Sequence, residues 1–168
     1  MVEDPVRDEH AHQDLPKLRQ ITTVKLGHGE EWGQRYDFNK LIESHDVDYA
    51  RCTLPNVGGI TEMLKIMAVC DTHRVGIVPH FTGPIATAGH MQTMMAFPGQ
   101  VLMEYNLGER PVPYLSDFLE CRNGKVWPND RPGLGVTVDE RQLAFVEAIT
   151  EGAPGATQRR LDGSLTHW

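Results

Sequence analysis

The sequence predicts an α/β fold with a parallel sheet of the barrel type. Short apolar runs typical of strands alternate with segments in which apolar residues recur every three or four positions, as they do in helices. In addition, each run is followed by a side chain that can move a proton or bind a cation. The carboxyl ends of parallel strands meet at one face of a barrel, so these side chains are expected to converge there.

Five short runs are predicted to be strands. The first lies at residues 2–3, and the others occupy residues 21–26, 48–54, 75–79 and 101–104. The run at 75–79 is the clearest, because it is rich in β-branched residues and leads into a histidine and a Gly-Pro pair that suits the start of a helix. The candidate functional residues at the ends of the runs are Glu3, Glu30, Thr53, His80 and Glu104.

Helices are predicted between these strands. A short helix is expected within residues 8–19, and Asp37 is expected to cap a second one. Two further helices are expected to begin after Gly59 and at Pro84. The spacing of apolar residues predicts the inward positions of the last three helices: Phe38, Leu41 and Ile42, then Ile60, Met63, Leu64 and Met67, then Ile85, Ala88, Met91 and Met95.

The last third of the chain has a different character. Residues 106–168 contain several prolines, with turns predicted at Asn123-Gly124 and Pro132-Gly133. Asp139 is a candidate cap for a helix that would run through Leu143, Val146 and Ile149. We therefore expect residues 1–105 to form the barrel part and residues 106–168 to form an irregular extension that packs on the barrel or its capping region.

Composition excludes several classes of function. The chain has 168 residues, 40% hydrophobic and 23% charged, which is ordinary for one globular domain. A net charge of −7 without a Lys/Arg-rich run argues against nucleic-acid and anionic-membrane partners. No apolar stretch approaches the roughly 18 residues that a transmembrane helix needs. Three cysteines without metal-type spacing predict reduced thiols, as in a cytoplasmic protein.

Several motifs, taken in order, resemble the enolase superfamily, specifically the mandelate racemase/muconate lactonising enzyme group and its acid-sugar dehydratases. The matching pieces cover nearly the whole chain: Glu3-Asp4-Pro5, Gly29-Glu30, residues 35–38, residues 57–62, Pro79-His80, residues 83–85, Glu104 and residues 130–136. This resemblance implies the C-terminal part, about half, of a modified TIM-type (β/α) barrel, followed by the irregular extension.

The resemblance also implies a reaction and a set of site residues. By motif position, Glu3 and Glu30 match the second and third carboxylate ligands of a Mg²⁺ ion, a cation that prefers hard oxygen ligands. The metal would stabilise the enediolate formed when a proton is removed α to a carboxylate. His80 matches the family's acid or base, and Glu104 matches the group that hydrogen-bonds the substrate carboxylate when protonated.

Two departures from the family pattern bear on activity. Thr53 stands where the family has an aspartate that orients the histidine. Its hydroxyl can accept a hydrogen bond from the His80 ring but cannot hold an imidazolium by charge. The matched part also starts at the strand of Glu3, so the first metal aspartate, the lysine bases and the N-terminal domain are expected from another chain or a longer gene product. An incomplete barrel exposes strand edges, which predicts a complementing half or self-association.

Two functions follow from this reasoning. The first is a Mg²⁺-dependent lyase that dehydrates a sugar acid once the complementing half is present. The second is a non-catalytic remnant or interaction module that keeps the barrel fold. Simpler roles for single residues also remain open: Glu30 and Glu31 as exposed loop carboxylates, Glu104 as a solvated strand end, and His80 as a hydrogen-bonded structural residue.

Overall fold

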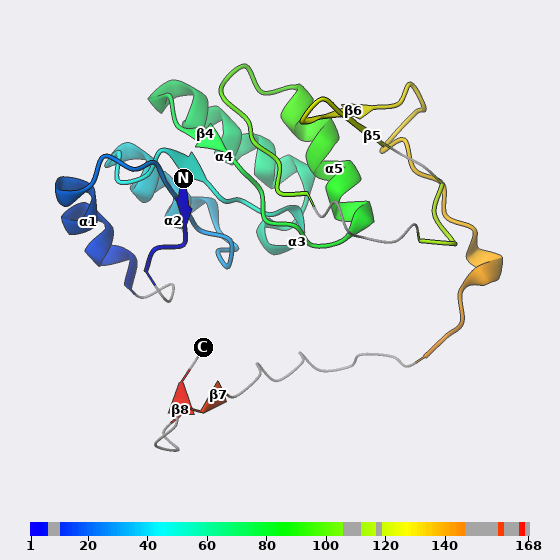
Figure 1. Ribbon diagram of the computed structural model, residues 1–168, viewed down its shortest axis with the longest axis horizontal. Helices are drawn as coiled ribbons and strands as arrows, with labels where there is room; N and C mark the ends of the chain where they lie inside the picture. Colours follow the sequence, from blue (N-terminus) through cyan, green and yellow to red (C-terminus); the bar gives the residue numbers. More distant parts are fainter. Residues whose placement is uncertain (7–10, 106–111, 117–118, 147–157, 160–164, 167–168) are drawn as a thin grey trace.

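A parallel sheet forms the centre of the protein. A computed structural model describes residues 1–6, 11–105, 112–116, 119–146, 158–159 and 165–166 (Figure 1). The sheet has the order β1-β2-β3-β4. All its strand pairs are parallel, and Val101 adds a parallel bridge to Ile77 beyond β4. The strands are β1 (Val2–Glu3), β2 (Leu26–His28), β3 (Tyr49–Ala50) and β4 (Gly76–Ile77). The predicted alternation of strands and helices around a parallel sheet is confirmed.

Three longer helices cover the sheet in chain order. Contacts join α2 to α4 and α4 to α5, and Figure 1 shows the three side by side. The core lies between them and the strands, with residues such as Phe38 and Met63 fully buried. The helical elements are η1 (Ala11–Asp14), α1 (Leu15–Ile21), α2 (Arg35–Glu43), α3 (Leu54–Val57), α4 (Ile60–His73) and α5 (Pro84–Met95).

The prediction of a strand at residues 21–26 is wrong about the residue at which the strand begins. Ile21 is the exposed last residue of α1, and β2 begins at Leu26. The segment between them is a loop held by Arg19, whose guanidinium donates to the carbonyl oxygens of Thr22 and Val24. These tertiary contacts outweigh the local β-propensity of the segment. The predicted strands at 48–54 and 101–104 are likewise shorter, because pairing is confined to β3 and to the bridge at Val101.

The predicted inward faces of α4 and α5 are wrong in part. Met63, Met67, Ala88 and Met91 are buried as expected. The predicted inward residues Ile60, Leu64, Ile85 and Met95 are exposed, and Ile66, Cys70 and Met94 are buried in their place. In α4 the buried set Met63, Ile66, Met67 and Cys70 keeps the expected helical spacing but lies one turn later, because contact with α2 and β4 selects that face.

The extension contains a hairpin. Strands β5 (Leu119–Arg122) and β6 (Lys125–Pro128) pair antiparallel, and the predicted turn at Asn123-Gly124 joins them with positive φ at both residues. Asp139 does act as a cap, since its side chain accepts from the Arg141 N–H.

The helix that Asp139 caps is much shorter than predicted. It is the single turn η2 (Glu140–Gln142), after which Leu143 is extended, and both Leu143 and Val146 are exposed. Ile149 lies outside the described residues. Two further short strands, β7 (Gln158–Arg159) and β8 (Leu165–Thr166), pair antiparallel.

Two further observations concern the described residues. None of the helices in this part of the chain is long and apolar enough to cross a bilayer. The three cysteines carry free thiols. Cys52 and Cys70 are buried, and burial raises the pKa of the Cys52 thiol to about 12, so these two cysteines act as small apolar core residues.

Gly29, immediately before Glu30, fixes the chain where β2 leads into the loop. Its φ is +110°, and a Cβ there would lie 2.7 Å from Cε1 of the buried Phe38 ring. We expect Gly29→Ala to lower the free energy of unfolding by about 2–4 kcal/mol, from backbone strain and overpacking together. Urea denaturation measures this loss.

Gly58 provides the matched control for Gly29. Its φ is +88°, but a Cβ there would meet nothing within 4 Å. Gly58→Ala is therefore expected to show backbone strain alone, roughly 1–2 kcal/mol. Equal losses in the two variants would show that the contact with Phe38 is not what requires glycine at position 29.

Candidate active site

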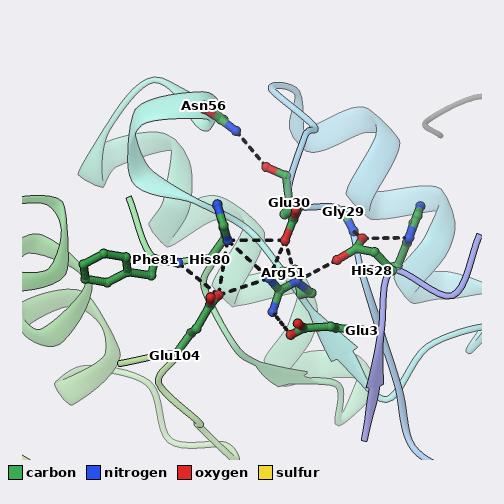
Figure 2. A network of polar contacts seen from close by, with 10 residues as sticks. Glu3, His28, Gly29, Glu30, Arg51, Asn56, His80, Phe81 and Glu104 are labelled. Carbon is green, nitrogen blue, oxygen red and sulfur yellow. Dashed lines mark hydrogen bonds and ion pairs between the residues drawn. The ribbon is translucent and has the colours of Figure 1, made fainter. Parts of the chain in front are cut away.

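Side chains from the carboxyl ends of neighbouring strands meet around one arginine (Figure 2). Glu3 ends β1, Glu30 follows β2, and Arg51 comes directly after β3. His80 follows β4, and Glu104 follows the bridge at Val101. The structure thus brings together four of the predicted site residues, Glu3, Glu30, His80 and Glu104, as the parallel topology requires.

Arg51 lies at the centre of the cluster, with its side chain 1% exposed. Its Nη1 is 2.8 Å from Glu3 Oε2, and its Nε is 2.8 Å from Asp4 Oδ2. Its Nη2 donates to Glu30 Oε2 and, at 3.1 Å, to Glu104 Oε2. One guanidinium therefore contacts four carboxylates, which is the kind of forked recognition for which arginine is suited.

The charges of this cluster stabilise one another. Burial alone would lower the pKa of Arg51, but the hydrogen bond and charge of Glu30, with the charges of Asp4 and Glu3, raise it overall. Arg51 is therefore always charged. The surrounding carboxylates differ in exposure, from 20% for Glu30 to 57% for Glu3.

Asp4 braces the cluster from the side of β2. Its Oδ1 accepts from the Gly29 N–H at 3.1 Å and lies 3.0 Å from Nδ1 of the buried His28. Burial would raise the pKa of Asp4, but these two contacts and the charge of Arg51 lower it overall. Asp4 is consequently an anion. It holds Arg51 in place through a contact of its own, separate from those of Glu3 and Glu30.

The His80 ring turns one nitrogen toward the cluster. Its Nδ1 is 3.2 Å from Glu104 Oε2, 3.4 Å from Glu30 Oε2 and 3.4 Å from Arg51 Nη2. About a third of the side chain is exposed, at 35%. Carboxylates thus orient the ring through Nδ1, and the exposure leaves room for a reactant beside it.

Thr53 does not take part in this arrangement. Its side chain is fully buried, and within the described residues Oγ1 has no hydrogen-bond partner, His80 included. The residue opens α3 without capping it through its hydroxyl. The suggested pairing of Thr53 with His80 is therefore not seen, and Glu104 and Glu30 provide the acidic partners of the ring instead.

Glu104 is ionised in this arrangement. It accepts from the Phe81 N–H at 3.1 Å as well as from Arg51. Burial raises the pKa of Glu104, but the Phe81 hydrogen bond, the Arg51 bond and charge, and the His80 contact outweigh it and lower the pKa. The role implied by the family resemblance needs the protonated acid, so Glu104 would have to lose Arg51 before it could take that role.

The cluster suits a cation, but the described residues do not form a complete metal site. No group of three or more His, Cys, Asp or Glu side chains in this part of the chain has the arrangement that holds a metal ion. Glu3 and Glu30 nevertheless turn carboxylate oxygens toward one positive charge, that of Arg51. Their hard oxygens and their convergence fit them as two of the ligands of Mg²⁺.

Arg51 and Asp4 are the site residues that sequence reasoning missed. Asp4 lies inside Glu3-Asp4-Pro5, one of the pieces that carry the family resemblance, whereas Arg51 lies outside these pieces, two positions before Thr53. The signal for Arg51 was a charged residue directly after the apolar pair Tyr49-Ala50, at the carboxyl end of a buried strand. A charged side chain at that position is seldom buried unless it is paired, so the position itself indicates ion pairs with the carboxylates of the other strand ends.

Comparison with known proteins identifies the same architecture. Residues 1–142 match the family model described as enolase C-terminal domain-like. D-galactonate dehydratase from Xanthomonas oryzae pv. oryzae (strain PXO99A) is 31% identical over 99% of this chain and 46% of the relative. The chain thus spans about half the length of the curated relatives that it matches.

Solved structures agree with this match. An enolase from Agrobacterium radiobacter with bound sodium and L-malate has a TM-score of 0.78 and 27% identity, over 97% of this chain and 45% of that one. An enolase from Pantoea ananatis with bound D-gluconate and magnesium has a TM-score of 0.73 and 28% identity, over 83% of this chain and 34% of that one. The predicted fold class, the C-terminal part of such a barrel, is confirmed.

Proposed function

Because the chain belongs to the enolase C-terminal domain-like family, we propose that it forms the catalytic face of a Mg²⁺-dependent lyase that dehydrates a sugar acid. The supporting observation is the convergence of Glu3, Glu30, His80 and Glu104 at the carboxyl ends of parallel strands. Its relatives include sugar-acid dehydratases, among them D-galactonate dehydratase. The substrate class proposed here is accordingly a carboxylic acid with hydroxyls at the α and β carbons.

Each residue has a role that its position supports. Glu3 and Glu30 would hold the Mg²⁺ ion, which when bound supplies positive charge for the enediolate. His80, oriented through Nδ1 by Glu104 and Glu30, would act as the proton donor or acceptor at the substrate. Loss of the α proton and of the β-hydroxyl as water leaves an enol, which becomes an α-keto acid. Glu104 lies beside His80 and would contact the substrate carboxylate.

We further propose that the open side of the sheet is covered by a complementing barrel segment or a second copy. Within the described part of the chain, β1 pairs with β2 alone, and its residue Val2 is 45% exposed. An unpaired strand edge is a ready template for association. The complement would also supply the remaining ligands that two glutamates cannot provide to an octahedral ion.

The test of this function is a dehydration assay. The chain, alone and together with any neighbouring segment encoded with it, is incubated with Mg²⁺ and a panel of sugar acids that includes D-galactonate. Formation of an α-keto acid, detected as its semicarbazone, supports the proposal. A preparation that contains the complementing segment, binds Mg²⁺ and yields no keto acid from any member of the panel would contradict it.

A non-catalytic interaction module is the second candidate. One observation favours it: Arg51 already balances part of the negative charge of the carboxylates, so the cluster holds together without a metal ion. A module of this kind would pass the folding tests but bind no Mg²⁺ and produce no keto acid. The assay above therefore separates the two functions.

Mg²⁺ binding gives a direct test of the ligand assignment. We expect weak binding by the wild-type chain, since only two carboxylates are assigned as ligands, and a loss of affinity of about tenfold or more in Glu30→Gln. Titration calorimetry measures both. Glu31→Gln is the matched control, because it removes the same charge from the exposed neighbouring residue. Tight Mg²⁺ uptake that Glu30→Gln leaves unchanged would remove Glu30 from the metal site.

A further inference from the structure

Arg51 has no part in the proposed reaction, yet it makes more contacts in the cluster than any assigned residue. It is the one member that contacts Glu3, Asp4, Glu30 and Glu104 together. It is also among the largest fully buried side chains of the described residues. Burying a guanidinium is expensive unless carboxylates compensate it, so its position at the centre calls for a functional explanation.

The oxygens that Arg51 holds are the ones a metal ion would need. Its Nη1 lies 2.8 Å from Glu3 Oε2, and its Nη2 donates to Glu30 Oε2. A divalent ion on the same two oxygens would stand within a few ångströms of the guanidinium. Repulsion between a divalent ion and a guanidinium at such close range is strong even at an effective dielectric constant of about 20. Glu3 and Glu30 are therefore not expected to hold Arg51 and a divalent ion at the same time.

We propose that Arg51 is the resident cation of the carboxylate cluster and that a divalent metal ion must displace it from Glu3 and Glu30 in order to bind. This inference rests on the proposed function, because it takes Glu3 and Glu30 as the metal ligands. Arg51 is a positioning residue in this scheme. It keeps the carboxylates converged in the metal-free site, and it weakens metal binding by the free energy of its own displacement.

The geometry provides a place for the displaced guanidinium. Nε contacts Asp4 Oδ2 at 2.8 Å, and Asp4 is neither a proposed metal ligand nor a group assigned to the substrate. Asp4 is itself fixed by Gly29 N–H and His28. Arg51 can thus release Glu3 and Glu30 while it stays charge-compensated, so a small shift is enough.

The first measurement is Mg²⁺ affinity by calorimetry on the full chain and on Arg51→Gln. Removing the competing cation is expected to tighten Mg²⁺ binding by about tenfold or more, the size of effect that one nearby charge produces. Arg35→Gln is the control, since Arg35 pairs with Glu62 at 2.6 Å on the helix surface and should leave the affinity unchanged. Equal affinities in the wild type and Arg51→Gln, at a site that Glu30→Gln abolishes, would overturn the inference and leave the proposed function standing.

A second measurement uses the wild-type chain, so it does not depend on whether Arg51→Gln folds. In ¹⁵N-arginine-labelled protein, the Nε–Hε signal of Arg51 is identified by its absence in Arg51→Lys. With EDTA the Nε–H donates to Glu30 Oε2 at 3.2 Å, and Mg²⁺ should remove this hydrogen bond and so shift the signal. Mg²⁺ binding that leaves this signal unmoved would refute displacement. Absence of Mg²⁺ binding in the wild type and both variants would refute the proposed function and this inference together.

Discussion

Replacing His80 by asparagine is expected to lower turnover of the assembled, Mg²⁺-loaded enzyme by about 10²–10⁴-fold, the usual contribution of a general acid or base. Substrate affinity should change little, because asparagine fills a similar volume and can keep a polar contact to Glu104. The geometric reason is that Nδ1 lies 3.2 Å from Glu104 Oε2, which fixes the ring, while 35% of the side chain stays exposed. Initial rates over a range of substrate concentrations separate kcat from KM.

His45 offers a matched control for this substitution. It is exposed and has a φ of +54°, a backbone conformation that asparagine adopts easily. His45→Asn should therefore retain full activity. If His80→Asn also retained activity, or lost it with an unchanged pH–rate profile, proton transfer would have to be assigned to another group.

The replacement of the family's aspartate by Thr53 predicts a His80 ring without a carboxylate to hold it by charge, and the structure differs. Glu104 and Glu30 contact Nδ1, so the ring has carboxylate partners although the family's aspartate is replaced. Thr53 Oγ1 instead lies buried without a hydrogen bond among the described residues. A departure from the family pattern at one position thus does not by itself remove the acidic partner of the histidine.

The order of elements and the convergence of the strand ends could be predicted because they depend on local patterns. The apolar runs at 75–79 and the helical spacing after Gly59 are properties of short segments. Parallel topology then places Glu3, Glu30, His80 and Glu104 at one edge whatever the details of packing. The four residues accordingly lie where the sequence predicted them.

The role of Arg51 could not be predicted in the same way. A long, flexible side chain takes its direction from its partners, and those of Arg51 lie 48, 21 and 53 positions away in Glu3, Glu30 and Glu104. No local pattern encodes such contacts. The face of α4 was misjudged for a related reason: Ile60 and Leu64 fit the helical spacing as well as Ile66 and Cys70, and only the neighbouring helix and strand decide between them.

His90 links α5 to the start of α3 beneath the site. Its Nε2 accepts from the Leu54 N–H at 2.9 Å, so the buried ring is held in its neutral form. Burial, helped by the charge of His80, lowers the pKa of His90 from 6.5 to about 4. In the unfolded chain the ring titrates near its ordinary value, and this difference makes His90 a source of pH-dependent stability.

We expect the free energy of unfolding to fall by about 3 kcal/mol, on account of His90, as the pH is lowered from about 6.5 to 4. Between these values the unfolded chain takes up a proton on His90 and the folded chain does not. The contribution of His90 to stability therefore rises with pH through this window and is fully present above it. The lowered pKa values of Asp4 and Glu104 add losses of their own in acid, so the prediction concerns a difference between two proteins.

That difference is measured against His90→Gln, whose amide oxygen can accept from the Leu54 N–H but does not titrate. Urea denaturation of both proteins at several pH values between 4 and 7 should show that the stability of the wild type, relative to that of His90→Gln, falls as the pH is lowered. His45→Gln, on the exposed surface, should follow the wild type throughout. Parallel curves for the wild type and His90→Gln would mean that the folded chain protonates His90 as readily as the unfolded chain, and that the bond to Leu54 does not hold the ring neutral.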